Sequence, residues 1–548
     1  MKKNLLIIIL LVTSVLSAQT QKKSSKTPFV WEAANVYFLL TDRFQNGDKT
    51  TETKIKRDLP TGKLRGFEGG DFRGIIQKID ENYFTDLGIN AIWITPVVEQ
   101  NHGGVDEGQG LTYGFHGYWT KDWSAIEPNL GTAKNLKELV TKAHAKGIRV
   151  LLDAVINHTG PVTKLDEVYP SDWVRTSPKC TYNSYDTYIN CCLVENLPDI
   201  LTESNANVEL PPFLIEKWKK EGRYEQEIKE LDAFFEKTKF PRAPKYYIMK
   251  WLSDYITDFG IDGYRVDTVK HTQENVWMDF RTVCDLKFAE FKKSNPKKVL
   301  DANPFFLVGE VYGYNIGGKR IYDFGDKKVD YFANGYSSLI NFDFRNEAKM
   351  DFEPLFLKYS TILQNDLRGK SVMNYVSSHD DSYPFDKKRE KTFESGTKLL
   401  LAPGISQVYY GDETARSLDI TGAEGDATLR SNMNWDEIKN NTETKKVQAH
   451  WQKLGKFRAN HPAIGAGKHQ MISQTPYVFS RSFTDGKYSD FVIVGLDLPI
   501  GKKEIPIGTI FKNGTKVKDA YSNKSAIVKN EKIEIDTEFN ILLLESTN

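Results

Sequence analysis

The sequence predicts an α/β fold: a (β/α)8 barrel with a subdomain inserted after its third strand and an antiparallel β-domain at its C-terminal end. Three observations indicate this class. Short apolar runs alternate with segments of helical periodicity, one long stretch interrupts that alternation, and β-runs separated by turn signals replace it after Gly465. A chain of 548 residues has room for two or three such domains.

Eight apolar or β-branched runs predict the barrel strands. In chain order they are residues 35–40, 91–94, 149–152, 263–266, 306–308, 339–344, 373–376 and 407–410. Helical patterns lie between them; in residues 135–144, for example, apolar positions recur at helical spacing until Gly147 stops the helix. We therefore assign residues 28–158 and 245–464 to the barrel.

Two segments depart from the barrel pattern. Residues 159–244 form too long a connection between strands three and four and are rich in aromatic residues, cysteine, proline and charge. We expect them to form an inserted subdomain, subdomain B, that builds one wall of a cleft. Residues 465–548 contain β-runs at 477–480 and 491–495 and turn signals at Asp485-Gly486 and Asn513-Gly514, which predict a C-terminal β-sandwich packed against the barrel.

Composition limits the partners and the location. The 74 basic and 73 acidic residues leave a net charge of +1, which gives no indication of nucleic-acid binding.

Lys2 and Lys3 precede an apolar run, and Ser17 and Ala18 follow it, as in a secretory signal peptide over residues 1–18. The run is shorter than the ~20 residues that span a bilayer. We expect an exported protein, periplasmic or secreted, without a membrane anchor and monomeric.

The four cysteines permit a disulfide in an exported protein. Cys180, Cys191 and Cys192 lie close together in a loop-like segment, whereas Cys284 lies in a helical pattern. We expect one bridge, from Cys180 to Cys191 or to Cys192. The segment lacks paired CxxC spacing, so metal binding by these thiols is disfavoured.

The strongest functional signal is the segment from Gly263 to His271. It is a short apolar strand whose end carries Arg265, Asp267, Lys270 and His271. Side chains two residues apart on a strand point the same way, and strand C-termini form the catalytic face of a parallel barrel. Arg265 can therefore hold Asp267 ionised and oriented. The alternative is an ion pair that only caps the strand.

Three further strands end in polar residues. Residues 147–158 end in Asp153, Asn157 and His158, residues 305–312 contain Glu310, and residues 372–381 end in His379 and Asp380. In order, strand context and residue identity, the four segments resemble the α-amylase family of retaining glycoside hydrolases, glycoside hydrolase family 13. The resemblance extends from about residue 29 to about residue 465. Residues 36–48, 115–119 and 458–465 look most like the periplasmic α-amylases of Gram-negative bacteria within that family.

This resemblance implies a division of labour among three carboxylates. Retaining cleavage needs a nucleophile and an acid ~5 to 5.5 Å apart, roles that fit Asp267 and Glu310. Apolar neighbours would raise the pKa of Glu310 towards the ~6 of a working acid. Asp380 would bind sugar hydroxyls and favour the transition state. The implied substrate contacts are Tyr118, Trp119, His158, Arg265, Lys270, His271 and His379.

Four of these contacts have a simpler interpretation. The two histidines His158 and His379 could be structural hydrogen-bonding groups, and Tyr118 and Trp119 could be buried packing residues. Asp153 is expected to support Arg265. One position departs from the family: Ser378 stands where asparagine commonly precedes the histidine, which puts that one supporting contact in doubt.

The resemblance also implies calcium, a hard cation that prefers oxygen ligands. Asn157, Asp199 and the carbonyl of His271 would tie the insert to the barrel. A second site is suggested by Asn46, Asp48, Gly69 and Asp71, which look like a calcium loop of cyclodextrin-forming relatives. The alternative for this second set is a turn built from Asn-Gly-Asp and Gly-Gly-Asp.

The sequence is compatible with three functions. Leu197-Pro198-Asp199-Ile200 resembles the segment of α-1,4-acting amylases, which favours endo-hydrolysis of starch, glycogen and maltodextrins through a covalent intermediate. A cyclodextrin-forming glucanotransferase would use the same three carboxylates, but the sequence shows one β-domain and not the extra modules of those enzymes. A non-catalytic glucan-binding protein is the alternative of another class, and it would have no reason to retain all the catalytic side chains.

Overall fold

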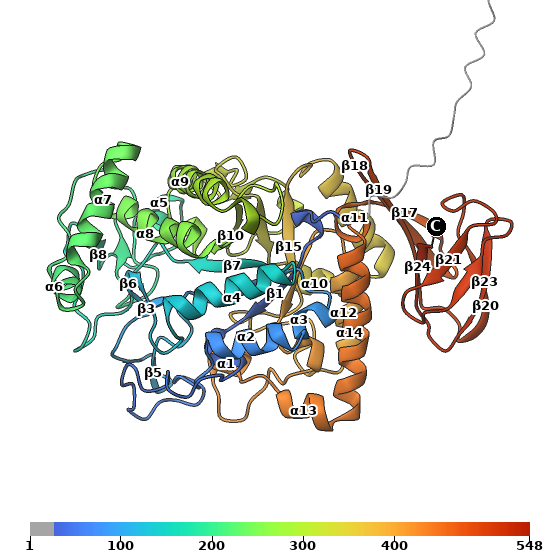
Figure 1. Cartoon of the computed structure of the whole chain (residues 1–548), viewed down its shortest axis with the longest axis horizontal. Helices are drawn as coiled ribbons and strands as arrows, with labels where there is room; N and C mark the ends of the chain where they lie inside the picture. Colours follow the sequence, from blue (N-terminus) through green and yellow to red (C-terminus); the bar gives the residue numbers. More distant parts are fainter. Residues whose placement is uncertain (1–26, 548) are drawn as a thin grey trace, which may run out of the picture.

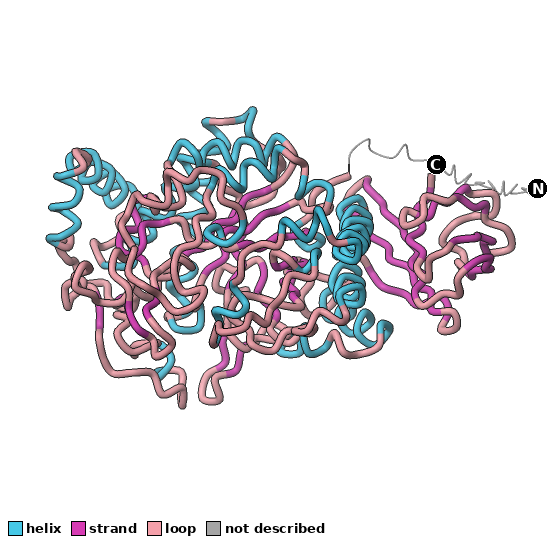
Figure 2. The backbone as a smooth tube through the Cα atoms, turned by 90° about the horizontal axis from the view of Figure 1, so that it is seen from below, coloured by secondary structure: helices cyan, strands magenta, loops and turns pink. Residues whose placement is uncertain are grey.

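Eight parallel strands close into a barrel at the centre of the molecule (Figures 1 and 2). The structure is a computed structural model and describes residues 27–547, so the predicted signal peptide lies outside the described residues. The strands adjoin in the order β1-β16-β15-β14-β11-β10-β7-β2. They are β1 Asn35–Leu39, β2 Ala91–Ile94, β7 Arg149–Ala154, β10 Gly263–Val266, β11 Phe306–Gly309, β14 Ser338–Asn341, β15 Ser371–Tyr375 and β16 Ile405–Tyr409. The predicted barrel is confirmed.

Every residue of these strands is buried, because side chains fill the barrel interior and helices cover the outside. The covering helices are α2 Phe72–Asp80, α4 Ala133–Ala145, α8 Pro244–Phe259, α9 Glu274–Ser294, α11 Phe352–Gln364, α12 Thr392–Leu401 and α14 Thr442–Asn460. Local sequence fixes their starts: Asp71 caps α2 through Gly74 N–H, and Thr132 and Asn135 form a capping box on α4.

The connection from β11 to β14 departs from the predicted alternation of strands and helices. A hairpin of β12 (Tyr322–Asp323) and β13 (Lys328–Val329) takes the place of a covering helix. Gly313 and Gly325 adopt positive φ in this segment, a conformation that interrupts a helix. The strand predicted at residues 339–344 is also shorter than expected, because Phe344 already begins the short helix α10 (Phe344–Glu347).

The insertion after the third barrel strand lies at the end of the molecule opposite the C-terminal domain (Figure 1). Its elements are β8 Val174–Arg175, α5 Asp186–Ile189, β9 Asp199–Ile200, α6 Pro212–Lys220 and α7 Tyr224–Thr238. A disulfide joins Cys180 to Cys191, one of the two predicted pairings, while Cys192 and Cys284 are buried thiols. This bridge closes the loop that carries Tyr182 and Tyr188.

Shorter elements complete the barrel and its loops. They are η1 Trp31–Ala33, α1 Thr41–Phe44, α3 Tyr83–Asp86, β3 Val98–Gln100, β4 Val105–Asp106, β5 Leu111–Thr112, β6 Thr120–Ile126, η2 Val269–His271, η3 Pro296–Lys298, η4 Ile316–Gly318, η5 Asp412–Thr414, η6 Gly425–Arg430, α13 Trp435–Asn440 and α15 Ala463–Ala466. Strands β3 and β6 pair with each other and extend the connection between β2 and α4.

The C-terminal segment forms the predicted antiparallel β-domain. A six-stranded sheet in the order β17-β18-β19-β24-β21-β22 accompanies the two-stranded sheet β20-β23. The strands are β17 Lys468–Ser473, β18 Tyr477–Asp485, β19 Tyr488–Leu496, β20 Gly501–Pro506, β21 Lys516–Asp519, β22 Ser525–Ile527, β23 Lys532–Thr537 and β24 Leu542–Ser546. Helix α14 stands between this domain and the barrel (Figure 1). His461 connects the two parts, with Asp490 on one ring nitrogen at 2.8 Å and Glu545 on the other at 2.9 Å.

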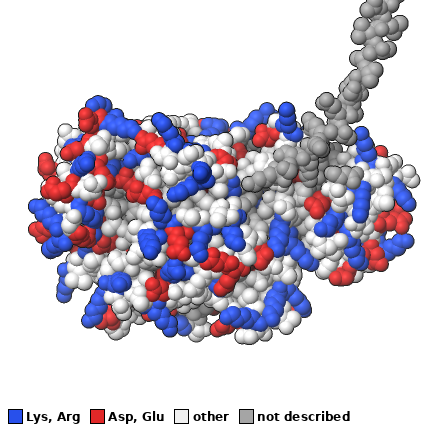
Figure 3. Space-filling model, in the orientation of Figure 1, with Lys and Arg blue, Asp and Glu red and all other residues white. Residues whose placement is uncertain are grey.

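The surface agrees with the neutral composition. Basic and acidic side chains are interspersed over the face drawn in Figure 3, without a broad area of one sign. Within residues 27–547, no helix is both long and apolar enough to cross a bilayer.

Candidate active site

Arg265 lies at the carboxyl end of β10 and joins carboxylates from three neighbouring strands. Its Nη1 atom lies 2.9 Å from Asp153 Oδ1 and 2.7 Å from Asp267 Oδ1, and its Nη2 atom lies 2.8 Å from Glu310 Oε1. Strand register explains part of this arrangement, since Arg265 pairs with Asp153 on β7 and with Val308, two residues before Glu310, on β11. The predicted orientation of Asp267 by Arg265 is thus present, and the same guanidinium also holds Glu310.

Asp153 anchors the far side of this cluster. Its Oδ2 atom accepts hydrogen bonds from Trp93 Nε1 at 3.2 Å and from the Tyr118 hydroxyl at 2.9 Å. Burial and the charge of Asp267 raise the pKa of Asp153 to about 7 against the opposing effect of Arg265. Asp153 therefore fixes the guanidinium from behind and orients Tyr118, the support expected of it.

Glu310 lies in the environment of an acid that keeps its proton. Burial raises its pKa well above the ordinary value; Arg265 opposes this shift, and the charges of Asp267 and Asp380 add to it. Its Oε2 atom accepts the backbone N–H of Thr268 at 2.9 Å. Asp267 and Glu310 thus contact the two terminal nitrogens of one guanidinium, and both line the same cleft.

Asp380 faces these groups from the loop after β15. Although desolvation opposes ionisation, His379 and Arg430 hold the pKa of Asp380 well below its usual range. Arg430 donates to Asp380 Oδ1 at 2.6 Å, and His379 Nε2 lies 2.8 Å from Asp380 Oδ2. Ser378, the departure from the family pattern, accepts the N–H of Asp380 at 3.4 Å. Asp380 is therefore an ionised carboxylate at the cleft.

The cleft has a volume of about 510 Å³ and contains several predicted residues. Its lining consists of Tyr182, Tyr188, Leu193, Asp267, Thr268, Lys270, His271, Glu310, Tyr312 and Asp380. The insertion after β7 supplies Tyr182, Tyr188 and Leu193, so it does form a wall of the cleft. A small recess beside the cleft brings Arg265 and His379 together with Trp93 and Tyr375.

Lys270 lies among tyrosine rings on the insertion side. Its Nζ atom is 4.9 Å from the ring centre of Tyr188, 5.3 Å from that of Tyr312 and 5.6 Å from that of Tyr322. Burial lowers the pKa of Lys270 to about 8, with Glu310 opposing the shift. A lysine in this position can donate to a sugar hydroxyl, while the tyrosine rings pack against the apolar faces of the sugar.

The remaining predicted contacts differ in position. Tyr118 stacks on the imidazole of His379 with centroids 5.5 Å apart, and the Nε2 atom of His158 lies 3.2 Å from the Tyr118 carbonyl oxygen. His271 lines the cleft, and its Nδ1 atom lies 3.1 Å from the Tyr188 carbonyl oxygen. Trp119 is buried against His116 and does not line the cleft, which favours the packing interpretation for this residue.

Several buried polar atoms at this site have no hydrogen-bond partner among the described residues. They are Nδ1 of His158, Nε of Arg265 and Nδ1 of His379. Burying a polar group without a partner is costly, so such groups in native proteins normally meet a ligand or water. Their position beside the acid cluster suits the hydroxyl groups of a bound sugar.

Sequence reasoning missed some residues that the fold brings to the cleft. Arg430 lies in η6, outside the four recognised segments, and its role depends on a contact across 50 residues with Asp380. The tyrosines Tyr182 and Tyr312 come from irregular loops, and Tyr188 comes from the short helix α5. No local pattern marks these positions; the only signal available was the abundance of tyrosine in the inserted segment.

Asn157 and Asp199, two residues of the first expected calcium site, lie together at the base of the insertion. The Asn157 amide is 3.2 Å from Asp199 Oδ2, and its oxygen accepts from Thr272, the residue after His271, at 3.2 Å. Burial raises the pKa of Asp199 to about 7, against the opposing effects of the Leu193 N–H, the Asn157 amide and the charge of Arg175. Carboxylate and amide side chains supply the oxygen ligands that calcium takes, so the residue types of this pair fit the ion.

The second expected set is arranged differently. Asp71 accepts backbone N–H groups from Gly47, Asp48 and Gly74, and Asp48 accepts from Thr50. Asn46 bonds to Glu52, and Gly69 donates its N–H to Asp42. Within residues 27–547, no three His, Cys, Asp or Glu side chains converge as a metal-binding group. These residues form a hydrogen-bonded turn and a helix cap rather than an oxygen cage, and the second calcium loop stays a prediction.

Taken together, a closed (β/α)8 barrel and a pair of carboxylates on one arginine define an enzyme of the glycoside hydrolase class. Residues 38–464 match the family described as "Alpha amylase, catalytic domain". The chain therefore belongs to the α-amylase family.

Individual relatives support this assignment. The chain is 34% identical to the periplasmic α-amylase of Escherichia coli over 531 residues, covering 86% of this chain and 74% of that protein. It is 27% identical to a cyclomaltodextrin glucanotransferase of Geobacillus stearothermophilus, over 84% of this chain and 59% of that one. The crystal structure of an α-amylase from Geobacillus thermoleovorans, complexed with acarbose, superposes with a TM-score of 0.65 at 21% identity, covering 95% of this chain and all of that one.

We expect Arg265→Met to destabilise the protein in a pH-dependent manner. The change leaves buried carboxylates without their cation, which costs about 3–5 kcal/mol of unfolding free energy. Without the guanidinium, the pKa values of Asp153 and Glu310 rise further in the folded state, above the ~4 of unfolded carboxyl groups. The variant therefore loses stability as the pH rises from about 4 through the raised pKa values of Asp153 and Glu310.

Differential scanning calorimetry at pH 5 and pH 8 measures this effect. The gap in melting temperature between the wild type and Arg265→Met should be wider at pH 8. Arg281→Met is the matched control, because Arg281 pairs with the half-exposed Asp285 on the same helix. An equal gap at both pH values for Arg265→Met would contradict the account.

Proposed function

We propose that this protein is an endo-acting, retaining α-amylase that hydrolyses α-1,4-glucosidic bonds of starch, glycogen and maltodextrins. One observation carries the proposal: Asp267 and Glu310 contact the same Arg265 guanidinium at 2.7 and 2.8 Å and line one cleft. Contact with one guanidinium keeps the two carboxyl groups near each other, as retention requires of a nucleophile and an acid ~5 to 5.5 Å apart.

In the first step, an oxygen of Asp267 attacks the anomeric carbon of the sugar on the donor side. The bond from that carbon to the leaving oxygen breaks, and Glu310 gives its proton to the leaving oxygen. In the second step, Glu310 takes a proton from water, the water oxygen bonds to the anomeric carbon, and Asp267 is released. Two inversions give net retention.

The two carboxyl groups differ because their surroundings differ. Burial, to which the charges of Asp267 and Asp380 add, raises the pKa of Glu310 well above its ordinary value and so favours its protonated form. Asp267 has the closest contact with the guanidinium, which stabilises its carboxylate for attack. Asp380, held ionised by Arg430, can accept sugar hydroxyls and favour positive charge at the anomeric carbon.

The other predicted contacts complete the sugar site in this proposal. Tyr118, fixed by Asp153 and stacked on His379, would offer its ring to the apolar face of the reacting sugar. His158 and His379 have ring nitrogens free to donate to hydroxyl groups. Lys270 and His271 lie among the tyrosines of the insertion and would contact the leaving-group sugars.

We propose that calcium is held by Asn157, Asp199 and the carbonyl oxygen of His271. When bound, it would neutralise the buried Asp199 carboxylate and join the insertion to the barrel. His271 belongs to the same short turn as Lys270, so the ion would also steady the leaving-group side of the cleft. It takes no part in the bond-making steps.

We also propose that the protein is exported, to the periplasm or beyond. The support is the similarity to a relative named as periplasmic, together with the signal-like N-terminal sequence. A disulfide between Cys180 and Cys191 suits an oxidising compartment.

A cyclodextrin-forming transferase is the second candidate, supported by relatives of that name at 25–27% identity. It would use the same carboxylates and differ in the acceptor. Chromatography of the products from starch separates the two, since hydrolysis gives linear maltooligosaccharides and the transferase gives cyclic ones. A non-catalytic glucan binder would release no reducing sugar.

We expect Glu310→Gln and Asp267→Asn to lose starch hydrolysis by at least about 10³-fold but to differ on α-maltosyl fluoride. Fluoride leaves without a proton, so Glu310→Gln should still expel it, whereas Asp267→Asn lacks the attacking oxygen. Fluoride release and reducing sugar are measured in parallel. Asp436→Asn, an exposed acid on α13, is the control and should match the wild type. Starch hydrolysis near the wild-type rate in either site variant would overturn the assignment.

We expect EGTA to lower the melting temperature of the wild type, because removal of calcium leaves Asp199 buried without a cation. Asp199→Asn should no longer respond to the chelator. Asp48→Asn tests the second loop and should respond like the wild type, since Asp48 lies in the hydrogen-bonded turn. Calorimetry with and without EGTA measures this effect. An unchanged melting temperature of the wild type would contradict the proposal of structural calcium.

A further inference from the structure

The β12–β13 hairpin stands beside the catalytic cleft without lining it. Its strands, Tyr322–Asp323 and Lys328–Val329, pair antiparallel in the segment where the barrel pattern predicts a helix. No residue of the hairpin belongs to the lining of the cleft. Its side chains nevertheless contact Tyr188, Lys270 and Tyr312, three residues that do line the cleft.

The hydroxyl group of Tyr322 connects two cleft residues of the barrel. It accepts a hydrogen bond from Lys270 Nζ at 3.3 Å and donates one to the carbonyl oxygen of Tyr312 at 3.1 Å. Burial raises the pKa of Tyr322 to about 12, so the hydroxyl keeps the proton that it donates. Within residues 27–547, the contact with Tyr322 is the one hydrogen bond of the Lys270 ammonium group. Tyr322 therefore fixes the direction of this ammonium group from outside the cleft.

Phe324, between the two strands of the hairpin, packs against the insertion. Its ring lies edge-on to the rings of Tyr185 and Tyr188, with centroids 5.1 Å apart in both cases, and 4.8 Å from the centre of the Tyr322 ring. Edge-to-face contacts hold aromatic rings at preferred angles. Phe324 thus connects the tyrosine that orients Lys270 with the tyrosine of α5 that lines the cleft.

Polar contacts fasten the turn of the hairpin to the same part of the insertion. Asp326 Oδ1 accepts the backbone N–H of Tyr185 at 2.8 Å. Lys327 Nζ lies 2.6 Å from Glu274 Oε1 and 3.8 Å from the centre of the Tyr185 ring, and the Tyr185 hydroxyl donates to the other oxygen of Glu274. The hairpin therefore joins the insertion to the barrel beside one end of the cleft.

The cleft residues that the hairpin contacts need such support. Lys270 carries its charge on a flexible four-carbon stem, and the side chain of Tyr312 is 55% exposed. Fixing mobile side chains before the substrate arrives lowers the entropy that binding costs. Contacts that strengthen in the transition state accelerate the reaction, and those with a leaving-group sugar act only on substrates that have one.

We propose that the β12–β13 hairpin positions the leaving-group side of the catalytic cleft. Tyr322 is the positioning residue for Lys270 and Tyr312, and Phe324 is the positioning residue for Tyr188. The inference rests on the proposed function, which places leaving-group sugars beside these three cleft residues. The same side receives the acceptor in the second step, so the hairpin also affects how well a sugar competes with water.

Tyr322→Phe tests the inference, because it removes one oxygen atom and keeps the ring. We expect kcat/KM for maltoheptaose to fall about tenfold, as for the loss of a hydrogen bond to a charged group. The value for α-maltosyl fluoride should be unchanged, because fluoride leaves without a sugar. With maltose added, the share of maltosyl groups transferred to maltose rather than to water should also fall. Phe324→Ala should show the same pattern, and Tyr322→Phe alone decides if Phe324→Ala does not fold.

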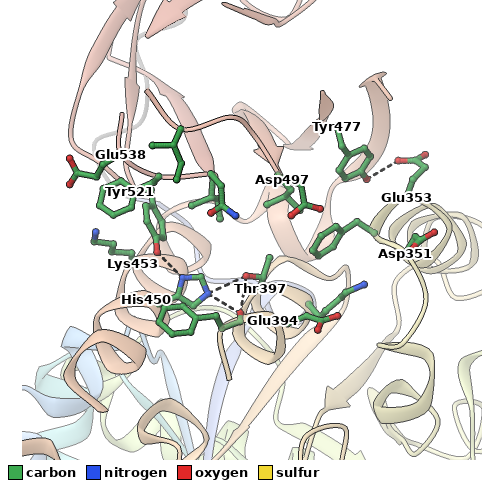
Figure 4. A pocket seen from close by; sticks show the side chains of 18 of the residues that line it. Asp351, Glu353, Glu394, Thr397, His450, Lys453, Tyr477, Asp497, Tyr521 and Glu538 are labelled. Atoms are coloured by element: carbon green, nitrogen blue, oxygen red, sulfur yellow. Dashed lines mark hydrogen bonds between the residues drawn. The ribbon is translucent and has the colours of Figure 1, made fainter. Parts of the chain in front are cut away.

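Tyr477→Phe is the matched control. Tyr477 is a half-buried tyrosine where the barrel meets the C-terminal domain, and its hydroxyl donates to Glu353 Oε2 at 2.8 Å (Figure 4). Loss of this hydroxyl should lower the melting temperature and leave the ratio of the two kcat/KM values unchanged.

An equal fall in kcat/KM for both substrates in Tyr322→Phe, or no fall for maltoheptaose, would overturn the inference. The proposed function is judged separately, since it fails if the wild type itself leaves maltoheptaose and starch intact.

Discussion

Three carboxylates from neighbouring strands share the guanidinium of Arg265, and the arrangement of the catalytic cleft depends on that contact. Each buried charge would cost several kcal/mol if left unpaired. The planar, permanently charged guanidinium can meet all three at fixed angles, which a lysine could not do. Through Asp153 the contact extends to Tyr118 and Trp93, and through Asp267 and Glu310 it extends to the cleft.

Burial and neighbouring charges act on Glu310 against the effect of Arg265. Glu310 lies between the negative charges of Asp267 and Asp380, which favours its protonated form, while Arg430 keeps Asp380 ionised. The barrel brings these groups together because their strands end on one face. The insertion after β7 then closes one side with tyrosines whose loop is held by the disulfide of Cys180 and Cys191. The carboxyl groups therefore lie at or just after strand ends, whereas loops form much of the wall of the cleft.

Sequence alone predicted what lies on regular elements. The eight strands, the helix at residues 135–144 and the grouping of Arg265, Asp267 and Glu310 follow from periodicity and from polar residues at strand ends. The missing helix between β11 and β14 was not predicted, because glycine conformations in that loop depend on context. The role of Arg430 could not be predicted either, since it arises from a contact between segments distant in the chain. The choice between Cys191 and Cys192 likewise needed the folded loop.

The central claim is that Asp267, held by Arg265, forms a covalent bond with the substrate while Glu310 supplies and removes the proton. Mass spectrometry of Glu310→Gln protein during turnover of α-maltosyl fluoride tests it most directly, because attack proceeds without the acid and release is slowed without the base. We predict a maltosyl adduct on the peptide that contains Asp267. An adduct on another carboxylate, or turnover of the fluoride with no adduct and with inversion at the anomeric carbon, would contradict the account.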